Sequence, residues 1–287
     1  MTCGYNPDID FLLFTNDTTA YEYPPNVKVY VTTMEQMANL FQKHFDFPLA
    51  LCQPYKLCDF KPTYGEVFSE YLIDYDYWGY CDCDLFWGNI RRFISDKILD
   101  KYQRIYTRGH CSVFRNTQKV NSWYRTLPGK GCQDWKKVLS GQDSFCFDEW
   151  AGHCGGGFSA IMKANGIEMY DRADMADLNR AKGYFKVNRW VGMNKRIAFH
   201  FVKGKLEVVD VAGNPLQEAL YVHFQKRRIS YKITKADKDE FYFSAPGVIG
   251  DEILEDRCGE LCYEMKYMAG KIQKKVRQLR TRRESVL

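Results

Sequence analysis

The most informative stretch of the chain is Tyr75-Asp76-Tyr77-Trp78-Gly79-Tyr80-Cys81-Asp82-Cys83-Asp84-Leu85-Phe86-Trp87-Gly88. Its first half is an aromatic run that is typical of a buried strand. The run ends in Asp82 and Asp84, and carboxylates at positions i and i+2 can both reach one cation if the chain turns there. Carboxylate oxygens suit Mg²⁺ or Mn²⁺, and these ions suit a diphosphate. The alternative is an acidic loop that faces water, which the apolar residues on both sides disfavour.

The segments around this stretch alternate between strand and helix patterns. We predict strands at 11–15 and 27–31, helices at 34–45, 55–58 and 65–73, and then the strand that ends at Cys81. That order is typical of an α/β fold with a mostly parallel sheet. A strand at 104–107 and helices at 120–127, 135–139 and 158–164 follow. After Glu168 the pattern is β-rich, with strands at 196–201, 205–211, 219–224 and 240–243 and a hairpin turn at Lys203-Gly204.

Composition narrows the class of protein. The 287 residues are 45% hydrophobic and 16% aromatic, which excludes a disordered chain. There are 11 cysteines without a Cys-x-x-Cys pair, and we interpret them as small buried apolar side chains in a reducing compartment. The sequence shows no signal peptide and no apolar run of transmembrane length. We therefore expect a cytoplasmic protein, or one that is peripheral on the inner face of the cell membrane.

The positive charge is concentrated at the C-terminus. The net charge is +5, and eight lysines and arginines follow position 265 against Glu284 alone. Apolar residues recur there at helical spacing: Leu261, Met265, Met268, Ile272, Val276 and Leu279. We expect a domain at 1–255 and an appended basic amphipathic helix at 256–287. Three interpretations of this helix are open: packing on the body, contact with anionic lipid, or binding of nucleic acid.

Several polar residues follow predicted strand ends. These are Asp17, the Asp82/Asp84 pair, and Arg108-Gly109-His110. Because open α/β sheets bind ligands at the carboxyl ends of their strands, we expect these residues at one edge of the sheet.

Four segments resemble an uncharacterised group of bacterial capsule-type glycosyltransferases in the metal-dependent GT-A superfamily. They are 61–65, 77–90, 108–116 and 221–227, within a resemblance that covers roughly residues 5 to 230. The resemblance implies a GT-A-like mixed, mostly parallel sheet flanked by helices. It also implies that Asp84 and His223 hold Mn²⁺ or Mg²⁺ on the donor diphosphate, with Asp82 on the metal or the donor ribose. Otherwise His223 is a core histidine in an alternating strand.

The remaining site residues are candidates for donor and acceptor contacts. Lys61 could bind phosphate as a point charge, or it could be a solvated lysine at a helix end. Arg108 and His110 could meet the donor or the acceptor, or they could be ordinary loop residues. Asp148 and Glu149 follow the strand-like segment 145–147. If the enzyme inverts the anomeric centre, one of them would be the general base, and we favour Asp148; the alternative is a helix N-terminus.

One departure from the superfamily concerns the N-terminus. Members normally open with a strand and loop that help to hold the nucleotide base, and here the chain starts close to Phe11. By resemblance that first strand is missing, and Asp17 would lie near the base or ribose.

Together these features predict a metal-dependent hexosyltransferase. It would move a sugar from a nucleotide diphosphate donor, a UDP-sugar by expectation, to a hydroxyl of a glycan or lipid-linked glycan acceptor. The alternatives are a GT-A-fold accessory protein without turnover and a nucleic-acid binder that uses the basic tail.

Overall fold

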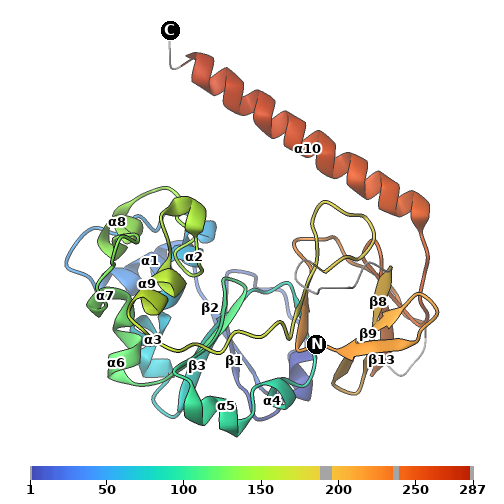
Figure 1. The fold of residues 1–287 in the computed structure, drawn as a ribbon, viewed down its shortest axis with the longest axis horizontal. Helices are drawn as coiled ribbons and strands as arrows, with labels where there is room; N and C mark the ends of the chain where they lie inside the picture. Colours follow the sequence, from blue (N-terminus) through green and yellow to red (C-terminus); the bar gives the residue numbers. More distant parts are fainter. Residues whose placement is uncertain (1, 188–195, 235–238, 285–287) are drawn as a thin grey trace. The chain divides into compact units, whose positions relative to one another are not determined.

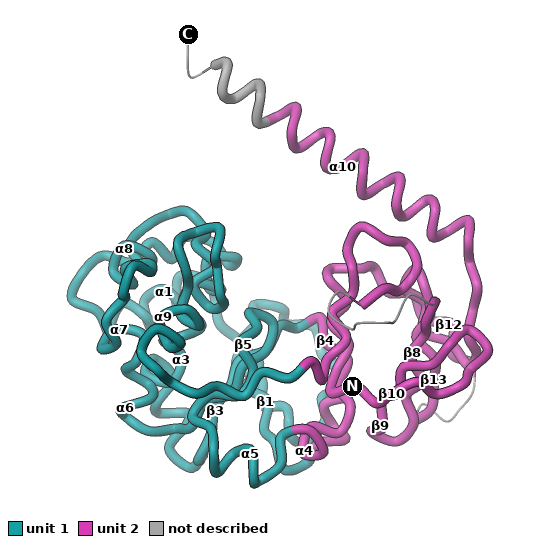
Figure 2. Tube along the Cα trace, viewed as in Figure 1, with its two compact units in different colours: residues 1, 7–83, 94–172 teal, residues 2–6, 84–93, 173–287 magenta. Residues whose placement is uncertain are grey.

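The computed structural model describes residues 2–187, 196–234 and 239–284, and for 278–284 it describes the backbone alone. The chain forms two compact units (Figure 2). Unit 1 comprises Pro7–Cys83 and Ile94–Arg172, and unit 2 comprises Thr2–Asn6, Asp84–Phe93 and Ala173–Leu287. The chain therefore passes from unit 1 to unit 2 within the Asp82-Cys83-Asp84 triplet.

Unit 1 combines short strands with many short helices (Figure 1). Its strands are β1 Phe11–Thr15, β2 Val27–Val31, β3 Tyr77–Cys81, β5 Arg104–Arg108 and β6 Cys111–Arg115. Its α-helices are α1 Met34–Gln42, α2 Leu57–Phe60, α3 Tyr64–Val67, α5 Asp96–Lys101, α6 Gln118–Asn121, α7 Trp123–Thr126, α8 Trp135–Ser140 and α9 Phe158–Ala164. Single 3₁₀ turns lie at Pro54–Lys56, Lys61–Thr63, Ser69–Tyr71 and Gly152–Cys154.

The strands of unit 1 form two small sheets. β1 pairs with β2 in parallel, and β6 lies between β3 and β5 and is antiparallel to both. β3 and β5 therefore run in the same direction, and their carboxyl ends meet at one edge. The core beside them is rich in aromatic rings: Trp78 stacks on Phe114 at 4.7 Å, and Phe41 and Phe60 are fully buried.

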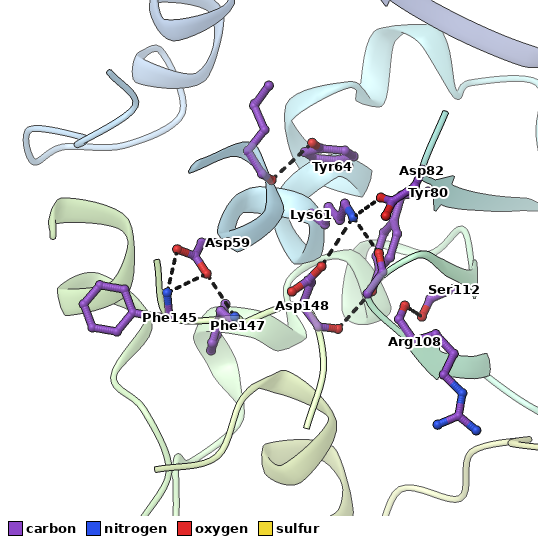
Figure 3. Close-up of polar contacts among 12 residues, drawn as sticks. Asp59, Lys61, Tyr64, Tyr80, Asp82, Arg108, Ser112, Phe145, Phe147 and Asp148 are labelled. Carbon is purple, nitrogen blue, oxygen red and sulfur yellow. Dashed lines mark hydrogen bonds and ion pairs between the residues drawn. The ribbon is translucent and has the colours of Figure 1, made fainter. Parts of the chain in front are cut away.

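A buried ion pair ties three segments of unit 1 together. The ammonium of Lys56 lies 2.9 Å from the carboxylate of Asp59, and both side chains have no exposed surface. Lys56 also donates to the carbonyls of Val138 and Asp143. Asp59 accepts the backbone N–H groups of Phe145 and Phe147, as Figure 3 shows. These hydrogen bonds from backbone N–H groups hold segment 145–147 as a loop. The prediction of a strand-like segment there is therefore wrong.

Unit 2 is β-rich, as predicted. Its strands are β4 Leu85–Trp87, β7 Ala176–Asp177, β8 Ile197–Val202, β9 Lys205–Asp210, β10 Pro215–Glu218, β11 Tyr221–His223, β12 Ser230–Lys232, β13 Glu240–Ser244 and β14 Val248–Gly250. Six of them form one sheet in the order β10-β9-β8-β13-β14-β12, and β11 lies between β4 and β7 in another. A 3₁₀ turn at Thr2–Tyr5 and helix α4 Ile90–Phe93 complete the body of the unit.

The prediction of a mostly parallel sheet is wrong. In the described part of the chain, β1–β2, β7–β11 and β12–β14 are parallel pairs, and the other pairs are antiparallel. The physical reason is the length of the connections, because a two-residue turn can join only antiparallel neighbours. Gly109-His110 joins β5 to β6 in this way, and Lys203-Gly204 joins β8 to β9. Both residues of the second turn have positive φ, at 46° and 86°, as the predicted hairpin requires.

Three other sequence predictions differ in detail. The helix at 65–73 is a short α3 followed by a 3₁₀ turn, and the helix at 120–127 is divided into α6 and α7 at Ser122. The interpretation of the cysteines as buried apolar side chains is correct for Cys111 but wrong for Cys52, Cys81, Cys83, Cys258 and Cys262, which are exposed. Cys52 and Cys83 lie in connections, Cys81 ends β3, and Cys258 and Cys262 lie on α10, so apolar neighbours in the sequence do not report the exposure of these thiols.

The predicted basic C-terminal helix is present as α10, which spans Arg257–Glu284 (Figure 1). Its first turns contact the rest of unit 2 through Glu260, which is 6% exposed and paired with Arg196. Among the described residues, no helix is both long enough and apolar enough to cross a membrane.

We expect Lys56→Met to lower the free energy of unfolding by roughly 3–5 kcal/mol, because it leaves the Asp59 carboxylate buried without its partner. Urea denaturation followed by tryptophan fluorescence measures this change. Lys101→Met is the control, since Lys101 pairs with Glu168 at an exposed site and its loss should barely move the midpoint. Equal midpoints for the two variants would show that the buried pair contributes little.

Candidate functional site

The first group of polar residues lies at the carboxyl ends of β3 and β5 in unit 1. The N–H of Asp82 donates to the carbonyl of His110 at 3.0 Å, which closes this edge next to the β5–β6 turn. The sequence prediction that Asp82 and Arg108-Gly109-His110 share a sheet edge is therefore confirmed. Asp17 is not part of this edge, because β1 belongs to the separate β1–β2 sheet.

Lys61 is the centre of this group (Figure 3). Its side chain is 8% exposed, so the alternative of a solvated helix-end lysine is wrong. The ammonium donates to Asp82 Oδ1 at 2.7 Å and to the Gly109 carbonyl at 2.5 Å, and it lies 3.4 Å from Asp148 Oδ2. These neighbours keep Lys61 charged and hold its pKa well above the usual value despite burial. One buried cation thus joins three separate segments of unit 1.

Asp148 is the most perturbed carboxyl of the group. It is 3% exposed, and burial raises its pKa to about 7; Lys61 opposes the rise and the Glu149 charge adds to it. Its backbone carbonyl accepts hydrogen bonds from the Tyr80 hydroxyl at 3.0 Å and from Arg104 Nη2 at 3.1 Å, so the main chain is fixed. A carboxyl with a pKa near 7 can take up or release a proton at neutral pH.

Glu149 is exposed beside this buried carboxyl. Its pKa is also raised, by burial of part of the side chain, and the charge of Lys61 opposes that rise. A Cβ atom added to Gly109 would lie 2.8 Å from Asp148 Oδ2 and 3.2 Å from Glu149 Oε1. The glycine therefore lets two carboxyl groups approach the β5–β6 turn closely, where a side chain would push them away.

Arg108 and His110 have defined structural contacts. Arg108 is 8% exposed and pairs with Asp171 at 3.2 Å, while its Nη1 is buried without a hydrogen-bond partner in the described part of the chain. The carbonyl of His110 receives the Asp82 amide, as described above. Asp17 is exposed and accepts hydrogen bonds from Thr19 and Tyr21 in its own loop. The donor-binding roles of Asp17, Lys61, Arg108 and His110 stay predictions.

The second group lies in unit 2, where Asp84, Asp177 and His223 meet. β11 carries His223 and pairs with β4, which follows Asp84, and with β7, which ends at Asp177. His223 Nδ1 lies 3.0 Å from Asp177 Oδ1, and Nε2 lies 3.4 Å from Asp84 Oδ1. Burial lowers the pKa of His223, but the two carboxylates outweigh it and raise this pKa to about 9. Burial acts in the opposite direction on Asp84 and raises the pKa of this carboxyl. The contacts with His223 and the Lys226 amide outweigh burial and lower the pKa to about 2.

A strained turn after His223 encloses Asp84. Gln225 and Lys226 have φ values of 56° and 61°, a left-handed conformation that is costly for residues with side chains. It directs the Lys226 N–H to Asp84 Oδ2 at 2.8 Å, while the Phe224 N–H donates to the Asp84 carbonyl at 3.0 Å. The Gln225 amide donates to Asp177. Strain of this kind persists where the surrounding contacts over-determine the backbone, often at functional sites.

Arg227, the last residue of the segment after His223, fixes the turn through hydrogen bonds to neighbouring loops. Its guanidinium donates to the carbonyls of Asn179, Lys182, Gly183 and Pro246. The whole segment 223–227 therefore serves to position Asp84 and His223.

Asp84 and His223 fit a divalent cation. A carboxylate oxygen and an imidazole nitrogen 3.4 Å apart can be neighbouring ligands of one ion; the carboxylate suits Mn²⁺ or Mg²⁺, and imidazole is a ligand of first-row transition metals. Asp177 lies on the other ring nitrogen, as the carboxylate behind a metal-ligating histidine usually does. Asp82, predicted as a further ligand, is paired with Lys61 in unit 1, and its contact with the metal or ribose stays a prediction.

Three residues that hold these groups in place, Asp177, Gln225 and Asp59, are not marked by the sequence pattern. Asp177 ends a strand of two residues that has no apolar alternation, so nothing in the local pattern marks it. Gln225 lies inside the 221–227 segment that carries part of the resemblance, and its neighbour His223 was the available signal. The burial of Asp59 could not be predicted, because the sequence of a short helix does not distinguish a buried carboxylate from an exposed one.

Comparisons with known proteins place the chain in a family but give it no activity. No curated protein and no solved structure matches it. Residues 1–252 match a family of unknown function (DUF6625), so both groups described above lie within the matched region and α10 lies beyond it. The chain belongs to this family of unknown function.

Proposed function

We propose that the protein is a metal-dependent glycosyltransferase. It would transfer a sugar from a nucleotide diphosphate donor, a UDP-sugar, to a hydroxyl of a surface-glycan precursor. The observation that carries the proposal is the Asp84–His223 pair with Asp177 behind it. The resemblance of segments 77–90 and 221–227 to capsule-type glycosyltransferases supports the same conclusion, since these segments supply the pair.

Asp84 and His223 would hold Mn²⁺ or Mg²⁺ in unit 2. When bound, the ion would neutralise the diphosphate that leaves with the nucleotide. Asp177 keeps the His223 ring oriented through Nδ1, and the Lys226 N–H fixes the rotamer of Asp84. Both ligands are thus positioned before the donor binds, which lowers the cost of assembling the site.

Asp148 would act as the general base on the acceptor hydroxyl. Its pKa of about 7 suits that role, because a base is most effective when its pKa lies near the working pH. Lys61 would stabilise the carboxylate form, and Glu149, which is exposed, would contact the acceptor. Asp82 would remain paired with Lys61 or reach the donor ribose.

We expect His223→Ala and Asp84→Asn each to weaken Mn²⁺ binding in the presence of UDP by more than about 100-fold, and Asp177→Asn to weaken it by about 10–100-fold. The reason is that the first two changes remove ligands, whereas the third removes only the group that orients one of them. Isothermal titration calorimetry measures these affinities.

His200→Ala is the matched control, because His200 also pairs with a carboxylate, Glu240, at 2.9 Å in unit 2. It should leave Mn²⁺ affinity unchanged. If His223→Ala matched this control in metal affinity and differed only in thermal stability, His223 would be a structural histidine.

At Mn²⁺ concentrations that saturate the site, so that the ion has displaced the His223 proton, we expect hydrolysis of UDP-hexoses to rise with pH and level off above about 7, since Asp148 must lose its proton to act as a base. Asp148→Asn should lower kcat by about 10²–10⁴-fold. Asp46→Asn, at an exposed aspartate of unit 1, is the control and should keep the wild-type profile. An unchanged profile in Asp148→Asn would remove the base role, and nucleotide binding without any turnover would favour the accessory protein.

A further inference from the structure

The C-terminal helix α10 turns its polar side to unit 2. Glu260 pairs with Arg196, Glu264 accepts the Gly183 N–H at 3.0 Å, and the Tyr263 hydroxyl donates to the Arg180 carbonyl at 3.1 Å. At about 100° per residue, Tyr263 lies about 160–200° around the helix from Leu261 and Met265. On the same count Glu260 and Glu264 lie about 70–110° from the middle of the row formed by Leu261, Met265, Met268 and Ile272. The contacts to the unit therefore come from the side and the back of the helix and leave this apolar row uncovered.

The apolar face of α10 is exposed along its described length. Leu261, Met265, Met268, Ile272 and Val276 are between 43% and 63% exposed. Leu279 continues the stripe in sequence, but its side chain lies outside the described residues. A helix that packs on its own domain normally buries such a stripe, so this arrangement points to a partner that lies outside unit 2.

The charge around the stripe identifies the chemistry of that partner. Positions 266 to 287 contain eight lysines and arginines and a single acidic residue, Glu284. Lys271 and Lys275 follow Met268 and Ile272 by three residues, so they border the stripe directly. A partner that covers the stripe must therefore combine an apolar layer with negative charge, which are the properties of an anionic lipid surface.

A second copy of the helix fits this pattern poorly. A coiled-coil seam through Met265, Met268 and Ile272 would next place position 275 in the interface, and that residue is a lysine. The like charges that border the stripe would also face each other in a parallel pair. At a lipid surface the same lysine can extend its ammonium to the headgroups while its methylene groups stay in the apolar layer.

We infer that α10 binds in the plane of an anionic lipid bilayer, with the stripe of Leu261, Met265, Met268, Ile272 and Val276 in the acyl boundary and the flanking lysines on the headgroups. The inference does not depend on the proposed transferase activity, and it concerns a segment beyond the family match. It would keep the body of unit 2 at a surface where lipid-linked acceptors are found.

Sedimentation of the full chain with vesicles tests this inference. One set of vesicles contains phosphatidylglycerol and phosphatidylcholine in equal parts, and the other contains phosphatidylcholine alone. We expect the chain to partition to the first set and to be released by salt, because the attraction is screened within about 10 Å at 0.1 M. Lys271→Gln/Lys274→Gln/Lys275→Gln should weaken binding on the order of 100-fold.

A stripe variant and a matched control complete the design. Met265→Gln/Met268→Gln/Ile272→Gln removes the apolar face but retains good helix formers, and circular dichroism checks its helix content. We expect it to lose vesicle binding. Ile73→Gln/Tyr231→Gln removes two apolar side chains that are 78% and 74% exposed elsewhere, and it should bind like the wild type.

Three results would overturn the inference. The first is equal vesicle binding by the stripe variant and the control. The second is a dimer in solution that the stripe variant abolishes, without vesicle binding by the wild type, which would assign the stripe to a second copy. The third is salt-sensitive binding of RNA or DNA by the wild-type chain without binding to vesicles. That result would show that the lysines and arginines of α10 bind nucleic acid.

Discussion

The arrangement of unit 1 depends on the buried ammonium of Lys61. Asp82, Asp148 and Glu149 bring three carboxyl groups to one end of β3 and β5, and like charges in so small a volume repel each other. Lys61 offsets this repulsion by contacting Asp82, Asp148 and the Gly109 carbonyl. Asp148 is the most buried of the three, and its burial raises its pKa to about 7; the charge of Glu149 adds to this rise and Lys61 opposes it. The burial that packs this sheet edge thus creates a group suited to proton transfer.

Unit 2 uses the same principle with a histidine. His223 lies between Asp84 and Asp177, and the two carboxylates favour its charged form. A divalent cation would replace the proton on Nε2 and gain Asp84 as a second ligand, while Asp177 kept its bond to Nδ1. The arrangement that holds His223 between two carboxylates therefore also places two metal ligands, His223 Nε2 and Asp84, next to each other. The left-handed Gln225-Lys226 turn supports this interpretation, because an ordinary core histidine does not require a strained backbone beside its partner.

The sequence was most informative where chemistry and pattern coincide. An aromatic strand that ends in Asp82 predicts a sheet-edge carboxylate, and the structure has one. The Lys203-Gly204 turn could also be predicted, since tight turns need particular residues. Sheet direction was misjudged because the alternation of strands and helices does not reveal that β6 returns through a two-residue turn.

Lys61 was recognised as a candidate, but its burial was not, because burial of a lysine depends on carboxylates from the end of β3 and from the loop at 148. Asp17 was expected with the others because the prediction assumed one sheet, whereas β1 and β2 form their own. Asp177 and Asp59 act only through tertiary contacts, which local periodicity cannot report.

Whether Asp84 and His223 hold a divalent cation can be tested by anomalous diffraction. Crystals grown with Mn²⁺ and UDP should show an anomalous peak within about 2.0–2.4 Å of an Asp84 carboxylate oxygen and of His223 Nε2. Asp177 should remain hydrogen-bonded to Nδ1 in the same crystals. A fully occupied manganese peak at other residues, or bound UDP without a peak at this pair, would show that Asp84 and His223 do not form the metal site.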